Sequence, residues 1–199
     1  RFVRIENVTV LMIALGTVGF LGMAGTVVLG AFAGVRISLG RNRDAYVKPF
    51  TWWVVGRLAF LVGATNIATF ALFFLQTRLQ LTTEAAARPA SRLLMVVGLA
   101  LLLAAVPSGR LADRFGRKRL VALSGLVAAL GTLVMILARS LPQVYVAGIL
   151  IGGAAGLFYA ANWALGTGLV PEAEAGRFLG VSNLAGAGAG AVGAYIGGP

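Results

Sequence analysis

The chain has 199 residues, of which 59% are hydrophobic and only 12% are charged. Soluble domains carry about 25% charged residues, so this composition excludes an ordinary soluble fold. Cysteine and histidine are both absent, which excludes disulfides, thiolate or imidazole metal sites, and Cys/His or Ser-His-Asp catalysis within this chain. The net charge of +11 indicates that the partner is either nucleic acid or a membrane surface.

Six long stretches without a charged residue divide the chain. They are Asn7–Val35, Leu58–Thr77, Leu93–Gly109, Leu120–Ala138, Ser140–Pro171 and Phe178–Pro199. A helix needs about 17–25 apolar residues to cross a bilayer. Spanning segments are either helices or closed barrels, and barrel strands are shorter and alternate in polarity. The stretches therefore predict an all-α fold, a polytopic transmembrane helical bundle with six spanning helices.

The first stretch follows Arg1 and Arg4, an arrangement that is also found in secretory signal peptides. A signal peptide has an apolar core of about 7–15 residues, and this stretch is nearly twice as long. We therefore expect residues 1–34 to form a transmembrane helix, residues 35–50 a cytoplasmic linker and residues 51–199 five further helices. Because the chain does not begin with Met and ends directly after an apolar stretch, we expect it to be a fragment of a longer polypeptide.

The distribution of Lys and Arg predicts which connections are cytoplasmic. If six helices alternate across the membrane, segments 35–50, 109–120 and 171–178 share one side and carry ten basic residues, whereas the other side carries six. Short cytoplasmic loops are enriched in Lys and Arg, so the side with ten is predicted to be cytoplasmic. The positive charge is therefore interpreted as topology and contact with anionic lipids, not as a nucleic-acid surface.

Arg57 is the only ionisable residue well inside a predicted helix. If that helix begins near Phe50, Arg57 lies about 10 Å from its start. That depth is within reach of the cytoplasmic interface beside Trp52 and Trp53. We expect Arg57 to anchor this helix or to pair with another one, and substrate contact is the alternative.

The segment 109–119 reads GRLADRFGRKR. It is predicted to be a tight cytoplasmic turn between two membrane helices, in which Gly109 and Gly116 permit close backbone approach or a positive φ. Asp113 is the single acid among five bases, and we expect it to pair with a neighbouring guanidinium and to accept from free N–H groups at a helix N-terminus. A merely positive loop explains the bases but not the order of the glycines, the acid and the bases.

That order closely resembles the signature loop of the major facilitator superfamily of secondary transporters, G-x-L-A-D-R-x-G-R-K. Segment Trp52–Gly63 is similar to the opening of the seventh helix in that family, especially in its sugar–cation symporters, and Leu169–Arg177 is similar to the turn after the tenth helix. The resemblance implies that the six stretches correspond to helices six to eleven of twelve. Helices one to five and helix twelve are then missing.

By resemblance, the signature loop is a cytoplasmic latch. Its charge network forms when the cavity opens outward and breaks when the cavity opens inward. The resemblance assigns this gating role to six residues of this chain, Gly109, Asp113, Arg114, Gly116, Arg117 and Lys118.

Polar and aromatic side chains within two of the apolar stretches are candidates for a substrate cavity. Asn66 and Thr69 share one helical face of the second stretch, and Tyr159, Asn162 and Trp163 lie together on the fifth. The resemblance places the seventh and tenth helices at the central cavity and so favours these faces. The alternative is that these side chains form interhelical hydrogen bonds and aromatic packing.

Small residues are predicted to hold helices together. Gly148, Gly152 and Gly156 recur every four residues, and Gly30 and Gly34 repeat that spacing. Helices in lipid associate closely where small residues allow their backbones to approach. We therefore expect helix–helix contacts at these positions.

The sequence thus predicts part of a secondary active transporter that works by alternating access, in the plasma (bacterial inner) membrane. It is not expected to be an enzyme or to hold a cofactor or metal. The expected partners are membrane lipids, a small-molecule substrate and the missing N-terminal half-bundle. A sugar-like or other neutral polar solute is favoured. Hydrophobic drug efflux is the first alternative, and a non-transporting assembly factor is the second.

The positions of the acids bear on ion coupling. All six acids lie at helix ends or in loops of the predicted structure. If the transporter is a proton or sodium symporter, the carboxylate that couples transport to the ion is therefore expected in the missing half. For the same reason, a strongly cationic substrate is not expected to bind this half.

Overall fold

The computed structural model describes residues 44–170 and 172–197, together with Val10, Ala14, Gly25 and residues 28–30 and 32–37. The elements are α2 (Asp44–Leu79), α3 (Thr83–Phe115), α4 (Arg117–Leu137), α5 (Leu141–Gly168), the 3₁₀ turn η1 (Glu172–Glu174) and α6 (Ala175–Gly197). Within the described ranges the regular structure is entirely helical. The predicted all-α class is confirmed.

Four of the described helices are long and apolar enough to cross a membrane. Their candidate spans are Val47–Ile67, Thr83–Phe115, Arg117–Leu137 and Leu141–Gly168, which agrees with a polytopic helical membrane protein. Helix α6 is not among the four, and it contains many glycines, which add little hydrophobicity. Most of the first predicted span, 7–35, lies outside the described residues, so the count of six spans stays a prediction.

Two helices begin earlier than the charge-free stretches indicate. Helix α2 begins at Asp44, inside the segment that was expected to be a linker and upstream of Phe50. A charge-free stretch marks only the apolar part of a helix, so a helix can begin upstream of it. Helix α3 begins at Thr83, where the Thr82 side chain caps it by accepting a hydrogen bond from the amide of Ala85. The connection between α2 and α3 is therefore only residues 80–82.

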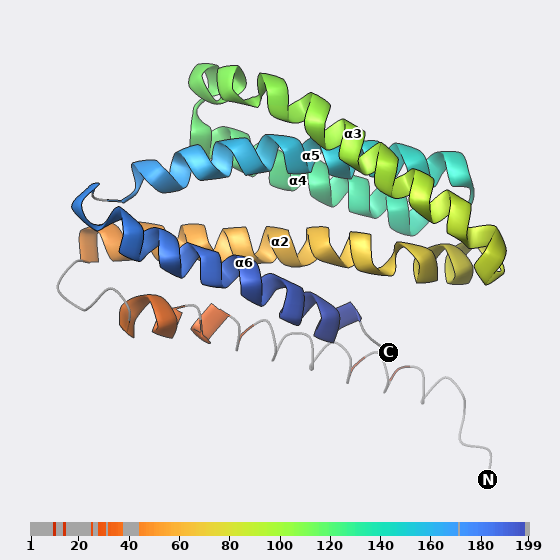
Figure 1. Cartoon of the computed structure of the whole chain (residues 1–199), viewed down its shortest axis with the longest axis horizontal. Coiled ribbons are helices and arrows are strands. Elements are labelled where there is room, and N and C mark those ends of the chain that lie inside the picture. The colour runs from red at the N-terminus through yellow and green to blue at the C-terminus, as the bar shows by residue number, and fades with distance from the viewer. Residues whose placement is uncertain are drawn as a thin grey trace, which may run out of the picture.

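The helices form two packed groups. Helix α5 packs most extensively against α3 and α4, whereas α2 packs against α6 (Figure 1). The boundary between α2 and α5 has fewer contacts. This boundary contains the cavity described below.

The α5 glycines at 148, 152 and 156 bring α3 close to α5. A Cβ atom at Gly152 would meet the backbone oxygen of Val97, and one at Gly156 would meet that of Leu101. A side chain at either position would therefore force the two backbones apart. The predicted packing role of these glycines is confirmed, whereas no described atom lies within 4 Å of a Cβ built at Gly30 or Gly34.

Aromatic rings at one end and a glycine contact further along hold α2 against α6. The Phe50 ring lies between the rings of Trp53 and Phe178, with centroid distances of 5.3 and 4.9 Å. Further along, a Cβ at Gly193 of α6 would lie 3.0 Å from the Asn66 side-chain nitrogen. Asn66 therefore faces α6.

Candidate functional site

The signature segment is mostly helix, and its turn is a single residue. Helix α3 continues to Phe115, Gly116 has φ +87° and ψ 133°, and α4 begins at Arg117. The expectation of a turn across the whole segment was wrong, because this end of α3 packs into the core: Ala112 is buried with Leu120 of α4 and Ala161 of α5. The expectation of a positive φ holds for Gly116 and not for Gly109, which is helical.

Asp113 and Arg114 lie exposed on the last turn of α3. The Arg114 guanidinium packs over the neighbouring Phe115 ring at 5.6 Å. Among the described residues, none forms an ion pair with Asp113, and a Cβ at Gly109 would meet none of them within 4 Å. The expected pairing of Asp113 with a neighbouring guanidinium is therefore absent from the described part of the chain.

Arg117 joins the signature turn to α5. It is the first residue of α4, and its Nη1 donates a 2.8 Å hydrogen bond to the backbone oxygen of Ala164. Ala164 lies in the last turns of α5, where carbonyl oxygens carry partial negative charge that favours a cation. The next residue, Lys118, lines the cavity between α2 and α5.

Arg57 and Asn162 connect α2 to α5 in the interior. The Arg57 Nη1 donates a 3.0 Å hydrogen bond to Asn162 Oδ1, and Trp53 Nε1 donates a 3.0 Å hydrogen bond to the Asn162 backbone oxygen. A Cβ at Gly166 would overlap the Trp53 ring, so the ring lies directly on the α5 backbone. We call Trp53, Arg57, Asn162, Trp163 and Gly166 the α2–α5 cluster.

Arg57 is buried, with 8% of its surface exposed. Its guanidinium carbon lies 4.8 Å from the ring centroid of Trp163 and 5.7 Å from that of Trp53. Because α2 begins at Asp44, Arg57 is about 20 Å along the helix, in the middle of the candidate span and not near its start. Its interhelical pairing agrees with the sequence expectation, whereas its expected depth was wrong.

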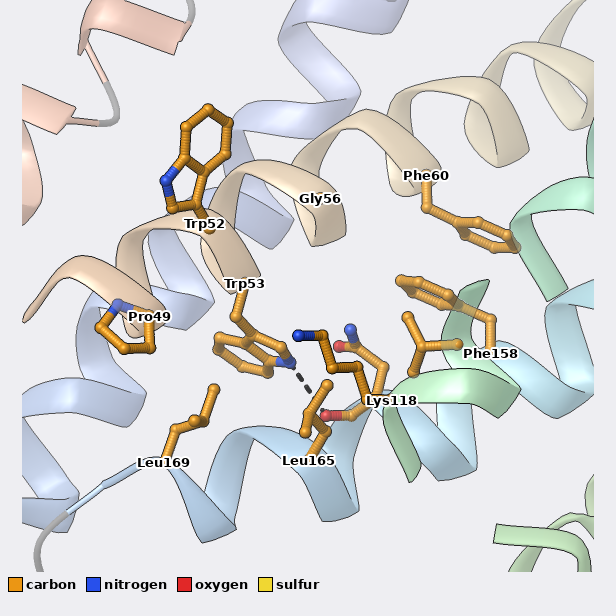
Figure 2. Close-up of a pocket in the computed structure, with 11 residues that line it drawn as sticks. Pro49, Trp52, Trp53, Gly56, Phe60, Lys118, Phe158, Leu165 and Leu169 are labelled. Carbon is orange, nitrogen blue, oxygen red and sulfur yellow. Dashed lines mark hydrogen bonds between the residues drawn. The ribbon is translucent and has the colours of Figure 1, made fainter. Parts of the chain in front are cut away.

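A cavity of about 670 Å³, the α2–α5 pocket, lies against this cluster (Figure 2). It is lined by Pro49, Trp52, Trp53, Gly56 and Phe60 of α2, Lys118 and Val121 of α4, and Phe158, Asn162, Leu165 and Leu169 at α5 and its end. The Phe60 and Phe158 rings stack at 3.7 Å between centroids. The described lining is thus aromatic and aliphatic, with one amide and one cation.

The five predicted cavity residues do not surround one cavity. Asn162 lines the α2–α5 pocket, and Trp163, which is 40% exposed, packs on Arg57. Tyr159 is half-buried near the same helix boundary. Asn66 instead lines a separate pocket of about 270 Å³ and donates to the oxygen of Val62 one turn earlier. Thr69 is exposed.

Sequence reasoning missed the aromatic lining of the α2–α5 pocket. Trp53 and Phe60 are seven residues apart and therefore lie on one face of α2. Phe158 and Asn162 are four apart on α5. The spacing of these residues indicates two shared helical faces. Of the residues that line the pocket, however, only Asn162 meets the criterion of a polar side chain within an apolar stretch.

The comparison with protein-family models places the chain in a family. The Major Facilitator Superfamily model matches residues 58–198, a range that includes the signature segment and most of the α2–α5 cluster. No curated protein and no solved structure gave a significant match. The matched range is well over half of the chain, and three helices within it, α3, α4 and α5, have the length and composition of membrane spans. The chain therefore belongs to the major facilitator superfamily, whose members are secondary transporters of the membrane.

Proposed function

We propose that this chain forms part of a transporter that moves a small organic solute by alternating access. The observation that carries the proposal is the junction between the signature segment and the α2–α5 pocket. Lys118 lines the pocket, and its neighbour Arg117 bonds to the end of α5. A shift of the signature turn would therefore move one wall of the pocket. In alternating access, helix bundles rock against each other around a central site, so a turn that contacts the pocket wall can link that motion to the site.

The proposed gating role rests on the same junction. Arg117 and Lys118 provide the contacts to α5 and the pocket, and Gly116 provides the backbone conformation of the turn. Among the described residues, Asp113 has no ion pair, a Cβ at Gly109 would meet no atom within 4 Å, and Arg114 packs only on its neighbour Phe115. We propose that these three residues act through the half of the transporter outside this chain. We further propose that the signature turn is cytoplasmic because of its five bases, and that the membrane is a plasma (bacterial inner) membrane.

The pocket lining favours a solute with an apolar or aromatic body. A sugar would need many hydrogen bonds, and burying its hydroxyls without partners costs free energy. The described lining offers only the Asn162 amide and the Lys118 ammonium, beside four aromatic rings. Among the sequence-based alternatives, a hydrophobic solute is therefore better supported than a sugar-like one.

Flux measurements test this function. The full-length transporter is reconstituted into liposomes, and uptake of labelled glucose and of labelled N-acetylphenylalaninamide is compared with uptake into empty vesicles, with and without a proton or sodium gradient. We expect uptake of the aromatic amide above the empty-vesicle level. Uptake of glucose alone would instead support a sugar carrier. The absence of any protein-dependent flux would support a non-transporting assembly factor.

A further inference from the structure

We infer that the α2–α5 pocket binds an organic anion, namely a carboxylate attached to an apolar or aromatic body. This inference rests on the proposed transport function and names the charge of its solute. It is carried by the charges around the pocket, by the Asn162 amide donor in its lining, and by its aromatic walls.

Two cations and no described acid surround the pocket. Lys118 is part of the lining, and Arg57 lies directly behind it, in contact with the lining residues Trp53 and Asn162. Among the residues that the structure describes, no carboxylate forms an ion pair with Arg57 or Lys118. A buried cation in a membrane is costly unless an anion or a set of acceptors compensates it. A negatively charged ligand would supply that compensation.

Hydrogen-bond donors remain unpaired at the same place. The Nε of Arg57 is fully buried behind the pocket lining and has no acceptor among the described residues, so the charge of Arg57 is only partly compensated. A guanidinium only donates, so its bond to Asn162 Oδ1 fixes the orientation of that amide and leaves Asn162 Nδ2 as a donor. No described residue accepts a hydrogen bond from Nδ2. An ionised carboxylate only accepts, and is therefore the complement of the Asn162 Nδ2 and Lys118 Nζ donors in the lining.

The walls of the pocket select the rest of the ligand. Trp53, Phe60 and Phe158 present aromatic surface, and the cavity of about 670 Å³ lies in the usual range for small-molecule sites. An inorganic anion such as phosphate would leave this aromatic surface uncovered. A neutral aromatic solute would cover it but would leave the two cations without a counter-charge. An aromatic or apolar carboxylate satisfies both requirements.

The test compares 3-phenylpropionate with its neutral amide, 3-phenylpropanamide. All three tryptophans of this chain belong to the region: Trp52 and Trp53 line the pocket and Trp163 packs on Arg57. Tryptophan fluorescence of the full chain in phosphatidylcholine nanodiscs therefore reports binding without any label. We expect the acid to bind about tenfold more tightly than the amide, because only the carboxylate gains a charge contact with Lys118 and a favourable potential from Arg57.

Variants identify the charges responsible. Lys118→Gln is expected to reduce the preference for the acid to about twofold or less, and Arg57→Gln is expected to do the same. Arg57→Gln removes a buried contact and can prevent folding. Lys118 is exposed, so Lys118→Gln is expected to fold and still tests the inference. Arg119→Gln is the matched control, since Arg119 is the adjacent exposed cation and does not line the pocket. It should leave the preference unchanged.

Three results would overturn the inference. The first is equal affinity of the acid and the amide for the unmodified chain. The second is an equal loss of preference in Lys118→Gln and Arg119→Gln, which would indicate a general surface potential. The third is that the pocket holds a lipid headgroup instead of a carboxylate solute. Native mass spectrometry in nanodiscs with phosphatidylglycerol would then show this lipid retained by the unmodified chain and lost in Lys118→Gln.

The binding test is independent of transport. If the acid is preferred but no solute is carried into liposomes, the proposed function fails and the anion site stands. If a neutral aromatic solute is transported but the acid is not preferred, only the anion site fails.

Discussion

The guanidinium of Arg57 donates a 3.0 Å hydrogen bond to the side chain of Asn162, 105 residues later in the chain. The same asparagine accepts a hydrogen bond from Trp53 on its backbone oxygen. Asn162 is 1% exposed, so both bonds are shielded from water. This pair of bonds holds α2 against α5 at the boundary where the helices otherwise make few contacts.

Replacing Asn162 by Ala is expected to lower the free energy of unfolding by about 1–2 kcal/mol. The change leaves the Arg57 Nη1 without its acceptor in a buried position, and the cost of an unpaired donor adds to the lost bond. Unfolding in detergent by added denaturant, followed by tryptophan fluorescence, measures this. Asn183→Ala is the control, because Asn183 is an exposed asparagine on α6. Equal stability of the two variants would contradict a structural role for the Arg57–Asn162 bond.

A single methyl group at Gly152 is expected to destabilise the chain by about 1–3 kcal/mol, the usual cost of overpacking. The new Cβ would overlap the backbone of Val97, which cannot move without shifting α3. The neighbour Gly153 has open space around its Cβ position, so Gly153→Ala should be neutral or slightly stabilising through the higher helix propensity of Ala. Thermal unfolding of both variants in the same detergent distinguishes them. A similar loss in both would show that propensity, not α3–α5 contact, governs this helix.

The turn at Gly116 provides a second comparison between glycines. Its φ of +87° is unfavourable for any residue with a Cβ, and Gly116→Ala is expected to cost about 1–3 kcal/mol. Gly109 is helical with open space around it, so Gly109→Ala should retain full stability. If Gly109→Ala is stable but transports poorly, the glycine is needed for contacts with segments outside the described residues. Loss of stability in Gly109→Ala would contradict this assignment.

Much of the fold was predictable from local patterns. Charge-free stretches located α2 to α6, because a span must exclude charge over about 20 residues. The four-residue glycine spacing identified a packing face of α5, and the structure shows that α3 is its partner. The starts of α2 and α3 were not predicted. Their first turns carry charged residues such as Asp44 and Glu84, which are stable in a helix outside the apolar core but interrupt a charge-free stretch.

The candidate site was predictable only in part. The order of residues in the signature segment identified the family, and the isolated charge of Arg57 indicated pairing between helices. Its partner could not be predicted, because a contact between α2 and α5 depends on how distant helices pack and not on local spacing. Helical geometry places Arg57 and Asn66 on opposite faces of α2. Only the structure shows that the Arg57 face adjoins α5 and that the Asn66 face adjoins α6.

Arg117→Gln is expected to loosen the end of α5 with little effect on global stability. The Arg117 bond to Ala164 is short but exposed to solvent, so its loss should cost about 0.5–1 kcal/mol. That corresponds to an increase of about two- to fivefold in amide hydrogen exchange over residues 164–168. Arg119→Gln, which removes the same charge two residues later, is the control and should leave the exchange unchanged. Equal acceleration in both variants would indicate an effect of charge alone.

Asp113→Asn separates gating from stability. An acid on the last turn of a helix opposes the helix dipole, and Asp113 is exposed without an ion pair among the described residues. Neutralising it should therefore leave the unfolding free energy unchanged or slightly higher. If Asp113 pairs with the other half of the transporter in one state of the cycle, the variant should transport about tenfold more slowly, a size typical of coupling between conformational states, with solute affinity nearly intact. Reconstituted full-length carrier provides both measurements.

Glu172→Gln is the matched control, because Glu172 is an exposed acid outside the signature segment. Transport at the unmodified rate in Asp113→Asn would show that this carboxylate has no part in the latch.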